Sequence, residues 1–474
     1  MYLMNMPNLR EAYVDVDGYC DGFLCKEESS NFLGLLLKDS PNLRILDISV
    51  VKDHGTDERN GMVSWNQSNF VPECLLDNIN GLPDDLLLKI LSFVPTYVAV
   101  STCVLSKRWE FIWMWLPNLE FKSVWNPWPG IVDFINKKLP IHRAPVIERL
   151  CIHITSNAHI KPEYIKRWIE IAVSHYVREL QIDYYSKTEI LFPSSLFTCE
   201  SLVTLKLNPV TLKDVPSRVC LPSLKTLQLE AESFFIDGKY LQQLISGCPV
   251  LEDLSLRFCC NDNLREFTVI IPSLQSLSLF LFGNSNLNRY KIDTPSLKYL
   301  KLEDWNDPEH YSWTNMPKLR EAYVDVESSN HLKTLIGSIT SVKRLTICCL
   351  EDYLYGDGFV FNHLEHLKLY DERNDIVCWN QPSSVLECLL SSLKILNWSA
   401  YFGRPQDRGI AVYILKNACH LKTATFLTDK RINDVRRLKM IKELRLSPRA
   451  SSTCQLVFDS LMKTLITMRF VYQL

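Results

Sequence analysis

The chain has 474 residues, and 47% of them are hydrophobic, which is enough to bury a large core and argues against general disorder. The 52 Lys and Arg residues nearly balance the 54 Asp and Glu residues, so the net charge of −2 argues against a nucleic acid or an acidic membrane as the main partner. The 15 Gly residues are few for this length, so the sequence disfavours folds with many glycine turns and sites with a glycine-rich phosphate loop.

The 16 cysteines are scattered, and no two of them have the Cys-x-x-Cys spacing. A secreted disulfide scaffold would be shorter and richer in cysteine. The first residues carry no basic segment followed by an apolar core, and no apolar run reaches the roughly 18 residues that a membrane span needs. These features predict reduced cysteines in an intracellular protein, in the nucleus, the cytoplasm or both, with no membrane partner.

Residues 1–76 nearly duplicate a later part of the chain. The run Met-Pro-Asn-Leu-Arg-Glu-Ala-Tyr-Val-Asp-Val at 6–16 differs at one position from residues 316–326. Shorter runs at 57–60, 65–67 and 73–76 recur at 371–374, 379–381 and 387–390. We therefore expect 1–76 to be a partial copy of late repeats, in which the tail of one tandem neighbour is joined to the head of the next, either by duplication or by a gene model that merges two genes. Two or three repeats without stacking partners should be only marginally stable.

The next segment has dense helix signals. Pro83 is placed as a first helical residue, Asp84 and Asp85 suit the positive end of the helix dipole, and Pro95 is expected to end the helix. Between them an apolar stripe has helical spacing, and it consists of Leu86, Leu87, Ile90, Leu91 and Val94. A second helical stretch is expected from Tyr97 to Val104.

This segment resembles an F-box, on the run Leu-Pro-Asp-Asp-Leu-Leu-Leu-Lys-Ile-Leu-Ser-Phe at 82–93 and the run Val-Leu-Ser-Lys-Arg-Trp at 104–109. The resemblance implies a small helical module, residues 77–120, that docks onto a Skp-type adaptor and through it joins a cullin-based ubiquitin ligase. It also implies the residues that contact the adaptor or form the module core, namely Leu82, Pro83, Leu86, Ile90, Leu91, Val104, Leu105 and Trp109. From the residues alone, Leu91 and Trp109 can equally belong to the core of the chain itself.

From about residue 147 onward, the pattern apolar-x-x-Leu-x-apolar recurs. Successive copies from Leu202 to Leu364 start 22, 27, 23, 23, 22, 23 and 22 residues apart, which is the period of leucine-rich repeats. Weaker copies start at Leu421 and Ile441. Each copy predicts a short strand whose leucines face one side, and stacked copies would pair their strands in parallel over one shared core.

Residues 386–459 are similar to an FBD region, with a helix expected over 409–417 and a repeat-like strand at the end of 439–446. Together, the F-box, the repeats at 121–385 and this region resemble the plant family of F-box proteins with leucine-rich repeats and a C-terminal FBD region. We expect an α/β fold, in which a leucine-rich-repeat solenoid of parallel strands follows a small helical F-box and is closed by an FBD-like cap. Residues 460–474 match no pattern.

The resemblance and the repeats favour a non-enzymatic substrate-recognition subunit of a ubiquitin ligase, with no cofactor and with an unidentified protein as its target. The alternative is a repeat scaffold without ligase association. The strand positions outside the core form the expected target surface, which is mixed in charge and contains aromatic residues: Gln181, Lys206, Gln228, Arg257, Lys301, Tyr323, Arg344, Lys368 and Tyr370.

An enzyme is disfavoured, because the chain has no Gly-x-Ser-x-Gly elbow and no His-Glu-x-x-His motif. His363 and His366 have the spacing of helical metal ligands, but they fall in a predicted strand, where residues three apart face opposite sides. We therefore predict no metal site.

Overall fold

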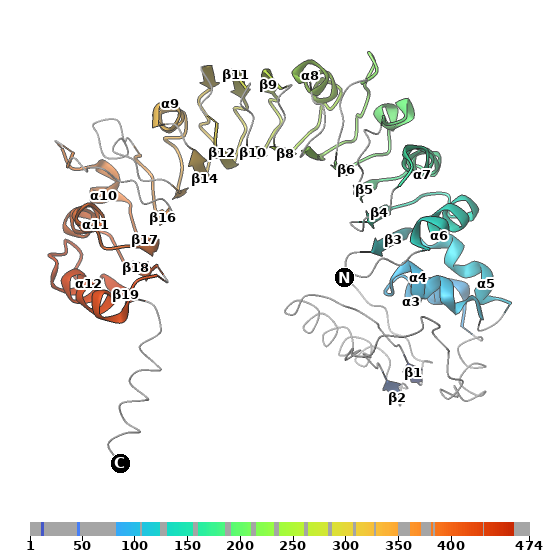
Figure 1. Ribbon diagram of the computed structural model, residues 1–474, viewed down its shortest axis with the longest axis horizontal. Helices are drawn as coiled ribbons and strands as arrows, with labels where there is room; N and C mark the ends of the chain where they lie inside the picture. The colour runs from blue at the N-terminus through green and yellow to red at the C-terminus, as the bar shows by residue number, and fades with distance from the viewer. Residues whose placement is uncertain are drawn as a thin grey trace. The chain divides into compact units, whose positions relative to one another are not determined.

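The computed structural model describes residues 11–13, 45–47, 82–104, 107–123, 130–154, 160–184, 191–209, 215–231, 237–259, 264–282, 287–306, 310–326, 329–348, 361–370, 381–382, 384–429 and 431–458 (Figure 1). The chain divides into two compact units, residues 1–116 and 117–474. Most of 1–76 and all of 460–474 lie outside the described residues.

Unit 1 contains a small group of helices that matches the expected F-box. Its elements are α3 (Asp84–Leu91), α4 (Thr96–Ser101), η1 (Thr102–Val104), α5 (Trp109–Ile112) and η2 (Trp113–Trp115). Helix α3 packs against α5 and η2, and α4 packs against η1 and η2. Unit 1 also contains two short strands, β1 (Glu11–Tyr13) and β2 (Ile45–Asp47), which pair in parallel.

The two prolines of this segment have different roles from those expected. Pro83 has an extended backbone and caps α3 rather than forming its first turn. Helix α3 ends at Leu91, and Pro95 caps the start of α4 instead of ending α3. The reason is that proline has a fixed φ and no N–H to leave unsatisfied, so it suits the start of a helix as well as it suits a stop.

Unit 2 is built on one long parallel sheet. Within the described residues this sheet has 14 strands, which follow one another in chain order except where three strands leave it for a second sheet. The strands are β3 (Asn118–Ser123), β4 (Arg149–Ile154), β5 (Glu179–Tyr184), β6 (Thr204–Asn208), β7 (Thr226–Ala231), β8 (Asp253–Cys259), β10 (Ser276–Phe282), β12 (Tyr299–Asp304), β14 (Glu321–Val326), β15 (Arg344–Ile347), β16 (His366–Tyr370), β17 (Ile395–Tyr401), β18 (Thr423–Thr428) and β19 (Gln455–Phe458).

The register of this sheet stacks the repeat leucines in continuous rows. Leu205 pairs with Leu227, Leu227 pairs with Leu254, and all three are buried. A single repeat exposes its leucines, so burial requires neighbours on both sides, and this requirement gives a solenoid. The predicted leucine-rich-repeat fold is therefore confirmed. The predicted boundary between residues 120 and 121 falls inside β3, which begins at Asn118.

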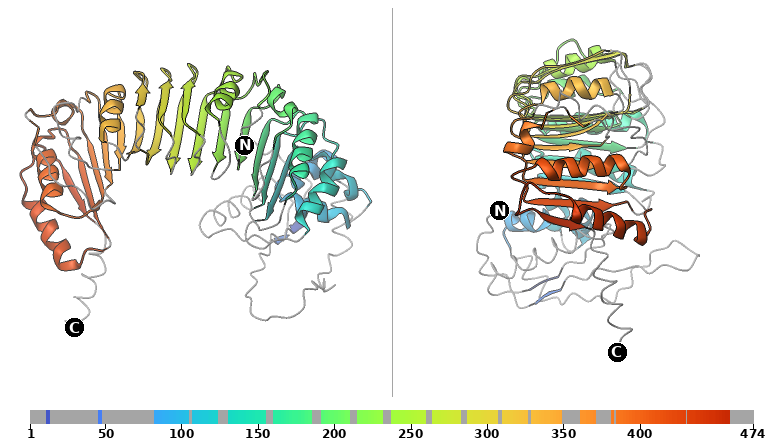
Figure 2. Two further views of the ribbon diagram at one scale, coloured as in Figure 1. Left: turned by 45° about the horizontal axis from the view of Figure 1, so that its top comes forward. Right: turned by 90° about the vertical axis from the view of Figure 1, so that its left-hand side faces the viewer.

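The sheet of unit 2 curves, with its strands on the inner side and most helices on the outer side (Figures 1 and 2). The outer layer before the cap contains α6 (Ile131–Lys138), η3 (Leu139–Ile141), α7 (Pro162–Ser174), η4 (Ser194–Thr198), α8 (Gly238–Ser246) and α9 (Ser329–Ser338). Between α8 and α9 the outer layer is a three-stranded parallel sheet, made of β9 (Glu266–Ile270), β11 (Arg289–Asp293) and β13 (His310–Trp313).

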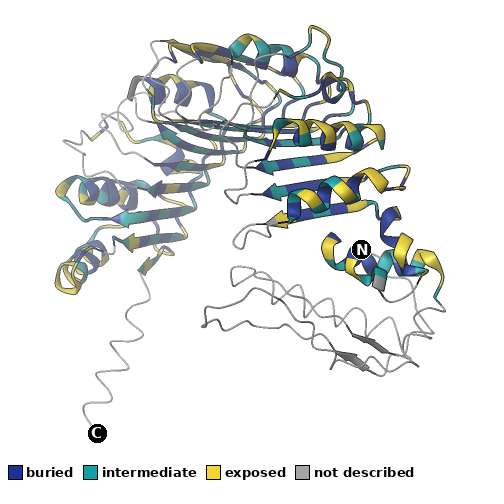
Figure 3. Ribbon diagram, turned by 45° about the vertical axis from the view of Figure 1, so that its right-hand side comes forward, coloured by how far each residue is buried: buried dark blue, intermediate teal, exposed yellow. Residues whose placement is uncertain are grey.

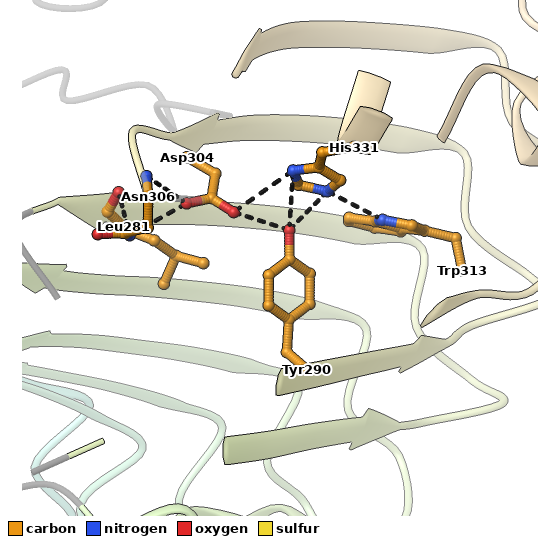
Figure 4. Close-up of polar contacts among 6 residues, drawn as sticks. All are labelled: Leu281, Tyr290, Asp304, Asn306, Trp313 and His331. Carbon is orange, nitrogen blue, oxygen red and sulfur yellow. Dashed lines mark hydrogen bonds and ion pairs between the residues drawn. The ribbon is translucent and has the colours of Figure 1, made fainter. Parts of the chain in front are cut away.

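A buried polar cluster joins the two sheets to α9 (Figure 4). The Tyr290 hydroxyl donates to Oδ2 of Asp304 at 2.8 Å and lies 2.6 Å from Nε2 of His331. The Trp313 indole N–H donates to the same Nε2 at 3.1 Å. Asn306 donates to Oδ1 of Asp304 through its backbone N–H and its side chain, both at 3.0 Å. These bonds satisfy polar groups from β11, β12, β13 and α9 inside an otherwise apolar core.

The C-terminal part of unit 2 alternates helices and strands, with α10 (Glu387–Ser391), α11 (Pro405–Asn417) and α12 (Asp434–Leu446) beside β17, β18 and β19. The predicted helix over 409–417 lies inside α11, but the predicted repeat-like strand at the end of 439–446 is wrong, because these residues end α12. The copy that starts at Ile441 also has helical spacing, and Met440, Ile441 and Leu444 are buried together on one face of α12.

Within the described ranges, no helix has the length and apolarity to cross a membrane. Cys248 and Cys388 are buried free thiols, as expected of cysteines that serve as small apolar residues.

Candidate protein-binding surfaces

The core of the helical module in unit 1 is formed by large apolar side chains. Leu87 is fully buried, and Leu91, Trp109, Ile112 and Trp113 are nearly so. Leu91 and Trp109 were both expected either to contact an adaptor or to form the module core. Their exposed fractions of 2% and 4% place them in the core, where they position the surface residues around them.

Four of the expected adaptor-contacting residues remain accessible. Pro83 is exposed, and Leu82, Leu86 and Ile90 are half-buried. They come from the start of α3 and from one stripe along it, because Leu86 and Ile90 are four residues apart. The Val104 side chain and Leu105 lie outside the described residues.

Two exposed aromatic residues of unit 1 were not among the expected contacts. Phe111 and Trp115 have exposed fractions of 42% and 47%. Their spacing of four residues is a signal that the sequence does contain, since such residues lie on one face of a helical turn.

The Arg108 side chain connects the two ends of the module by donating from Nε to Oδ1 of Asp84 at 2.9 Å. Both side chains are solvent-exposed, so this ion pair contributes little to stability. The ion pair joins the first turn of α3 to Arg108, the residue that precedes α5.

Most of the expected target-binding residues form one row across the inner face of the long sheet. Gln181 pairs with Lys206 and Lys206 with Gln228, while Lys301 pairs with Tyr323. Thr346 then connects Tyr323 to Lys368. Buried and more accessible residues alternate along the strands of the sheet (Figure 3). The row residues alternate with the buried leucines, so their side chains lie on the opposite face of the sheet, which is the inner side of the curve.

The remaining three residues of that prediction lie beside the row. Arg257 and Tyr370 lie two residues after the row position of their own strands, on the same face of the sheet. Arg344 lies two residues before the row position of its strand. All nine predicted residues therefore belong to one face, and each is exposed or half-buried.

An aromatic cluster on this face was missed by the sequence reasoning. Phe282 and Trp305 are 39% and 46% exposed, and their rings meet edge to face with centroids 5.2 Å apart. The Arg257 guanidinium lies 4.4 Å from the ring centroid of Phe280, on the neighbouring strand. The signal was present, because strict alternation in Ser-Leu-Ser-Leu-Phe-Leu-Phe puts Phe280 and Phe282 on the same side as the serines.

Local ion pairs compensate much of the charge on the inner face. Lys301 Nζ lies 2.7 Å from Oε1 of Glu303 and 5.3 Å from the ring centroid of Tyr323. Arg257 Nε lies 3.8 Å from Oε2 of Glu230. A face with paired charges and exposed aromatic rings suits a folded protein partner better than a polyanion.

Tyr323 and the neighbouring Cys348 thiol are held in their neutral forms. Burial raises the pKa of the Cys348 thiol to about 12, and burial together with a hydrogen bond to Cys348 raises the pKa of Tyr323. A thiol with a raised pKa supplies no thiolate nucleophile. The described residues contain no group of three or more His, Cys, Asp or Glu side chains that could hold a metal ion.

Three family models match separate parts of the chain. The F-box domain matches residues 79–121, the LRR repeats of an FBD-associated F-box protein match residues 165–322, and FBD matches residues 381–426. These matches follow the chain order of the helical module, the solenoid and the C-terminal cap.

Curated relatives from Arabidopsis thaliana align with this chain over almost the whole of their own lengths. A putative FBD-associated F-box protein is 80% identical and aligns with 81% of this chain and 99% of its own. An FBD-associated F-box protein is 56% identical over 78% of this chain and 98% of its own. A putative F-box/FBD/LRR-repeat protein is 40% identical over 81% of this chain and 100% of its own. This chain belongs to the family of FBD-associated F-box proteins.

Proposed function

We propose that this protein is a substrate-recognition subunit of a Skp–cullin–F-box ubiquitin ligase. In this proposal the helical module of unit 1 binds a Skp-type adaptor, and through it a cullin. The inner face of the solenoid binds the target protein. The observation that carries the proposal is the presence of an F-box match and a leucine-rich-repeat match in one chain.

The adaptor half of the proposal is supported by the division of the module into core and surface. The buried Leu87, Leu91 and Trp109 hold the module together, while Leu82 and Pro83 remain accessible at the start of α3. Docking would desolvate this apolar edge, and a few such side chains usually carry most of the binding energy. Phe111 and Trp115 are further candidates for the same contact.

The target half is supported by the composition of the inner face. A continuous strand surface with Phe282, Trp305 and Tyr323 among paired charges has the aromatic enrichment of protein-binding surfaces. We place the strongest target contacts at Phe282 and Trp305, since exposed aromatic residues are the usual hot spots.

Two double variants of the full-length chain test the two halves separately. Affinity purification from plant cells, with and without a proteasome inhibitor, should recover adaptor and cullin with the wild-type protein, and proteins that accumulate under inhibition are candidate targets. Leu82→Ala with Pro83→Ala should lose adaptor and cullin and keep the targets. Phe282→Ala with Trp305→Ala should lose the targets and keep the adaptor.

Failure of the wild-type chain to recover an adaptor would overturn the ligase assignment and favour the repeat scaffold. If neither variant loses the targets, the target-binding surface lies elsewhere than on the inner face. All four side chains changed in these variants are exposed or half-buried, so thermal unfolding of the solenoid should be unchanged in both variants.

We further propose that residues 1–76 are a partial duplicate of the repeats that precede the FBD-like region. In the duplicated run, Glu11 and Tyr13 correspond to Glu321 and Tyr323. Strand β1, which contains Glu11 and Tyr13, pairs in parallel with β2, as β14 does with β15. The curated relatives cover about four fifths of this chain and nearly all of their own lengths, which leaves room for an added segment of this size.

A further inference from the structure

The charge of the chain is separated by region, although its net value is only −2. Residues 401–458 carry 12 Lys and Arg against 4 Asp and Glu, a net charge of +8, so the rest of the chain carries −10. This stretch contains α11, α12, β18 and β19. The near-neutral total therefore conceals a strongly basic C-terminal cap.

The four carboxylates of residues 401–458 are each paired with an arginine. Asp407 pairs with Arg404 at 3.2 Å, and Asp429 pairs with Arg431 at 2.8 Å. In the same way, Arg437 lies 3.4 Å from Asp434, and Arg408 lies 3.2 Å from Glu443. The exposed lysines Lys416, Lys422, Lys439 and Lys442 have no carboxylate partner among the described residues. The positive excess is thus left to solvent and to any partner.

A groove of about 980 Å³ gathers part of this charge between α11 and α12. Arg408, Lys416, Arg436 and Lys439 line it, and Glu443 is its single lining carboxylate. Because Glu443 is paired with Arg408, the potential in the groove is positive.

An apolar stripe runs along α12 beside this groove. Val435, Leu438 and Leu446 have exposed fractions of 80%, 51% and 76%. At 100° per residue they share one face with Lys439 and Lys442, opposite the buried Met440 and Leu444. The helix therefore presents aliphatic and basic side chains together on its outer face.

We propose that the groove and the outer face of α12 bind an acidic protein segment, one that is rich in Asp and Glu and also carries aliphatic side chains. The carboxylates would meet Arg408, Lys416, Arg436 and Lys439, and the aliphatic groups would cover Val435 and Leu438. Burial of both kinds of group requires a partner that has both.

The same features argue against the two other polyanions. A nucleic acid supplies phosphates and bases that stack on exposed aromatic rings, whereas the exposed apolar groups of α12 are aliphatic. An anionic membrane is flat on this scale, whereas four of the basic side chains, those of Arg408, Lys416, Arg436 and Lys439, line a groove. The surface lies on the cap and is separate from the inner-face row, so this binding is additional to the proposed capture of a target.

Fluorescence anisotropy with the full-length protein tests the proposal. The probe is a labelled 16-residue peptide made of four Glu-Asp-Leu-Glu units, and the matched control peptide has Gln and Asn in place of the acids. We expect the acidic peptide to bind at least tenfold more tightly than its amide counterpart, and binding to weaken as salt is raised.

Three double variants locate the surface. Lys416→Glu with Lys439→Glu should weaken binding by about tenfold or more, and Val435→Ser with Leu438→Ser by about threefold to tenfold, since aliphatic contact is lost without a change of charge. Lys166→Glu with Arg167→Glu, on the exposed side of α7, changes the net charge equally and should leave binding unchanged. All six positions are exposed, so the variants should unfold at the wild-type temperature.

Equal binding of the two peptides, or an equal loss in the α7 variant, would overturn the proposal. It would also be overturned if a 20-nucleotide single strand, a duplex of the same length, or vesicles containing 30% phosphatidylserine bound more tightly than the acidic peptide. Adaptor recovery by the full-length protein should be the same for all three variants, which separates this result from the fate of the ligase assignment.

Discussion

His331 is held in its neutral form at the centre of the buried cluster in unit 2. Burial lowers the pKa of His331 to about 3, although Nδ1 lies 3.6 Å from Oδ2 of Asp304. The geometry agrees with a neutral ring, because the Trp313 N–H donates to Nε2 and therefore needs an unprotonated nitrogen there. The network thus depends on a histidine that does not take up a proton on mild acidification.

This cluster predicts a pH dependence of stability. The unfolded chain binds a proton on His331 below about pH 6.5, whereas the folded chain does not until about pH 3, so its contribution to stability is present above pH 6.5 and is lost as the pH falls. Between pH 7 and pH 5, the advantage of the wild type over His331→Gln in the free energy of unfolding should shrink by about 2 kcal/mol. Denaturant titrations at the two pH values measure this, and an equal pH dependence in both proteins would refute it.

Tyr290 supplies the hydroxyl that binds the Asp304 carboxylate. Tyr290→Phe leaves this buried group without one of its donors, so the free energy of unfolding should fall by about 1.5–3 kcal/mol. Tyr299→Phe, on β12, removes a hydroxyl at a half-buried position and should cost less than about 0.5 kcal/mol. Equal losses in the two variants would show that the hydroxyl of Tyr290 has no special role.

At the residue scale, the sequence predicted the periodic positions and not this cluster. Leu205 and Leu227 could be assigned to the core because alternation in one strand decides their side. Tyr290, Asp304, Trp313 and His331 come from four elements and follow no shared period. Their contact depends on the outer layer switching from strands to a helix, which no local pattern encodes.

At the scale of single elements, α12 shows why one pattern can have two outcomes. The run Ile-Lys-Glu-Leu-Arg-Leu at 441–446 fits the repeat strand, but Ile441 and Leu444 also fit one helical face, together with the preceding Met440. The preceding Asn433 settles the competition, because its side chain accepts from the backbone N–H of Arg436 at 2.9 Å and caps the helix. A capping signal upstream of a repeat-like run could therefore have corrected the prediction.

The turn between β17 and α11 depends on Gly403. Its φ is +64°, and an added Cβ would lie 2.6 Å from side-chain atoms of Met440 on α12. Gly403→Ala should therefore lower the free energy of unfolding by about 1–3 kcal/mol, through backbone strain and a clash in the cap. Gly337→Ala, in α9, has nothing within 4 Å of the new Cβ and should be stabilising by about 0.5–1 kcal/mol. Calorimetry on both variants measures this contrast, and a destabilised Gly337→Ala would contradict it.

At the scale of the whole molecule, the repeat period and the F-box motif were enough to predict the order of the parts. The period reports a structural unit that must be repeated to be stable, so it predicts the solenoid directly. The aromatic cluster at Phe282 and Trp305 could have been derived from alternation, whereas the basic cap was hidden by a near-neutral total charge. Net charge describes a chain of this length poorly when its regions differ in sign.

The N-terminal duplicate gives a prediction for the full-length chain. Repeats that lack a complete stack should be cleaved before the solenoid, so limited proteolysis should remove residues 1–70 first. Deletion of 1–76 should leave adaptor recovery and the unfolding of the solenoid unchanged. The fusion hypothesis fails if 1–70 resists cleavage as strongly as the repeats do.

The most direct test of the account is the affinity of the purified full-length protein for a purified Skp-type adaptor, measured by isothermal titration calorimetry. We predict a one-to-one complex that Leu82→Ala with Pro83→Ala weakens by at least about tenfold, while Phe282→Ala with Trp305→Ala binds as the wild type does. Absence of a complex with the wild type, or equal affinity of wild type and the Leu82 and Pro83 double variant, would contradict the central claim that this module connects the solenoid to a ubiquitin ligase.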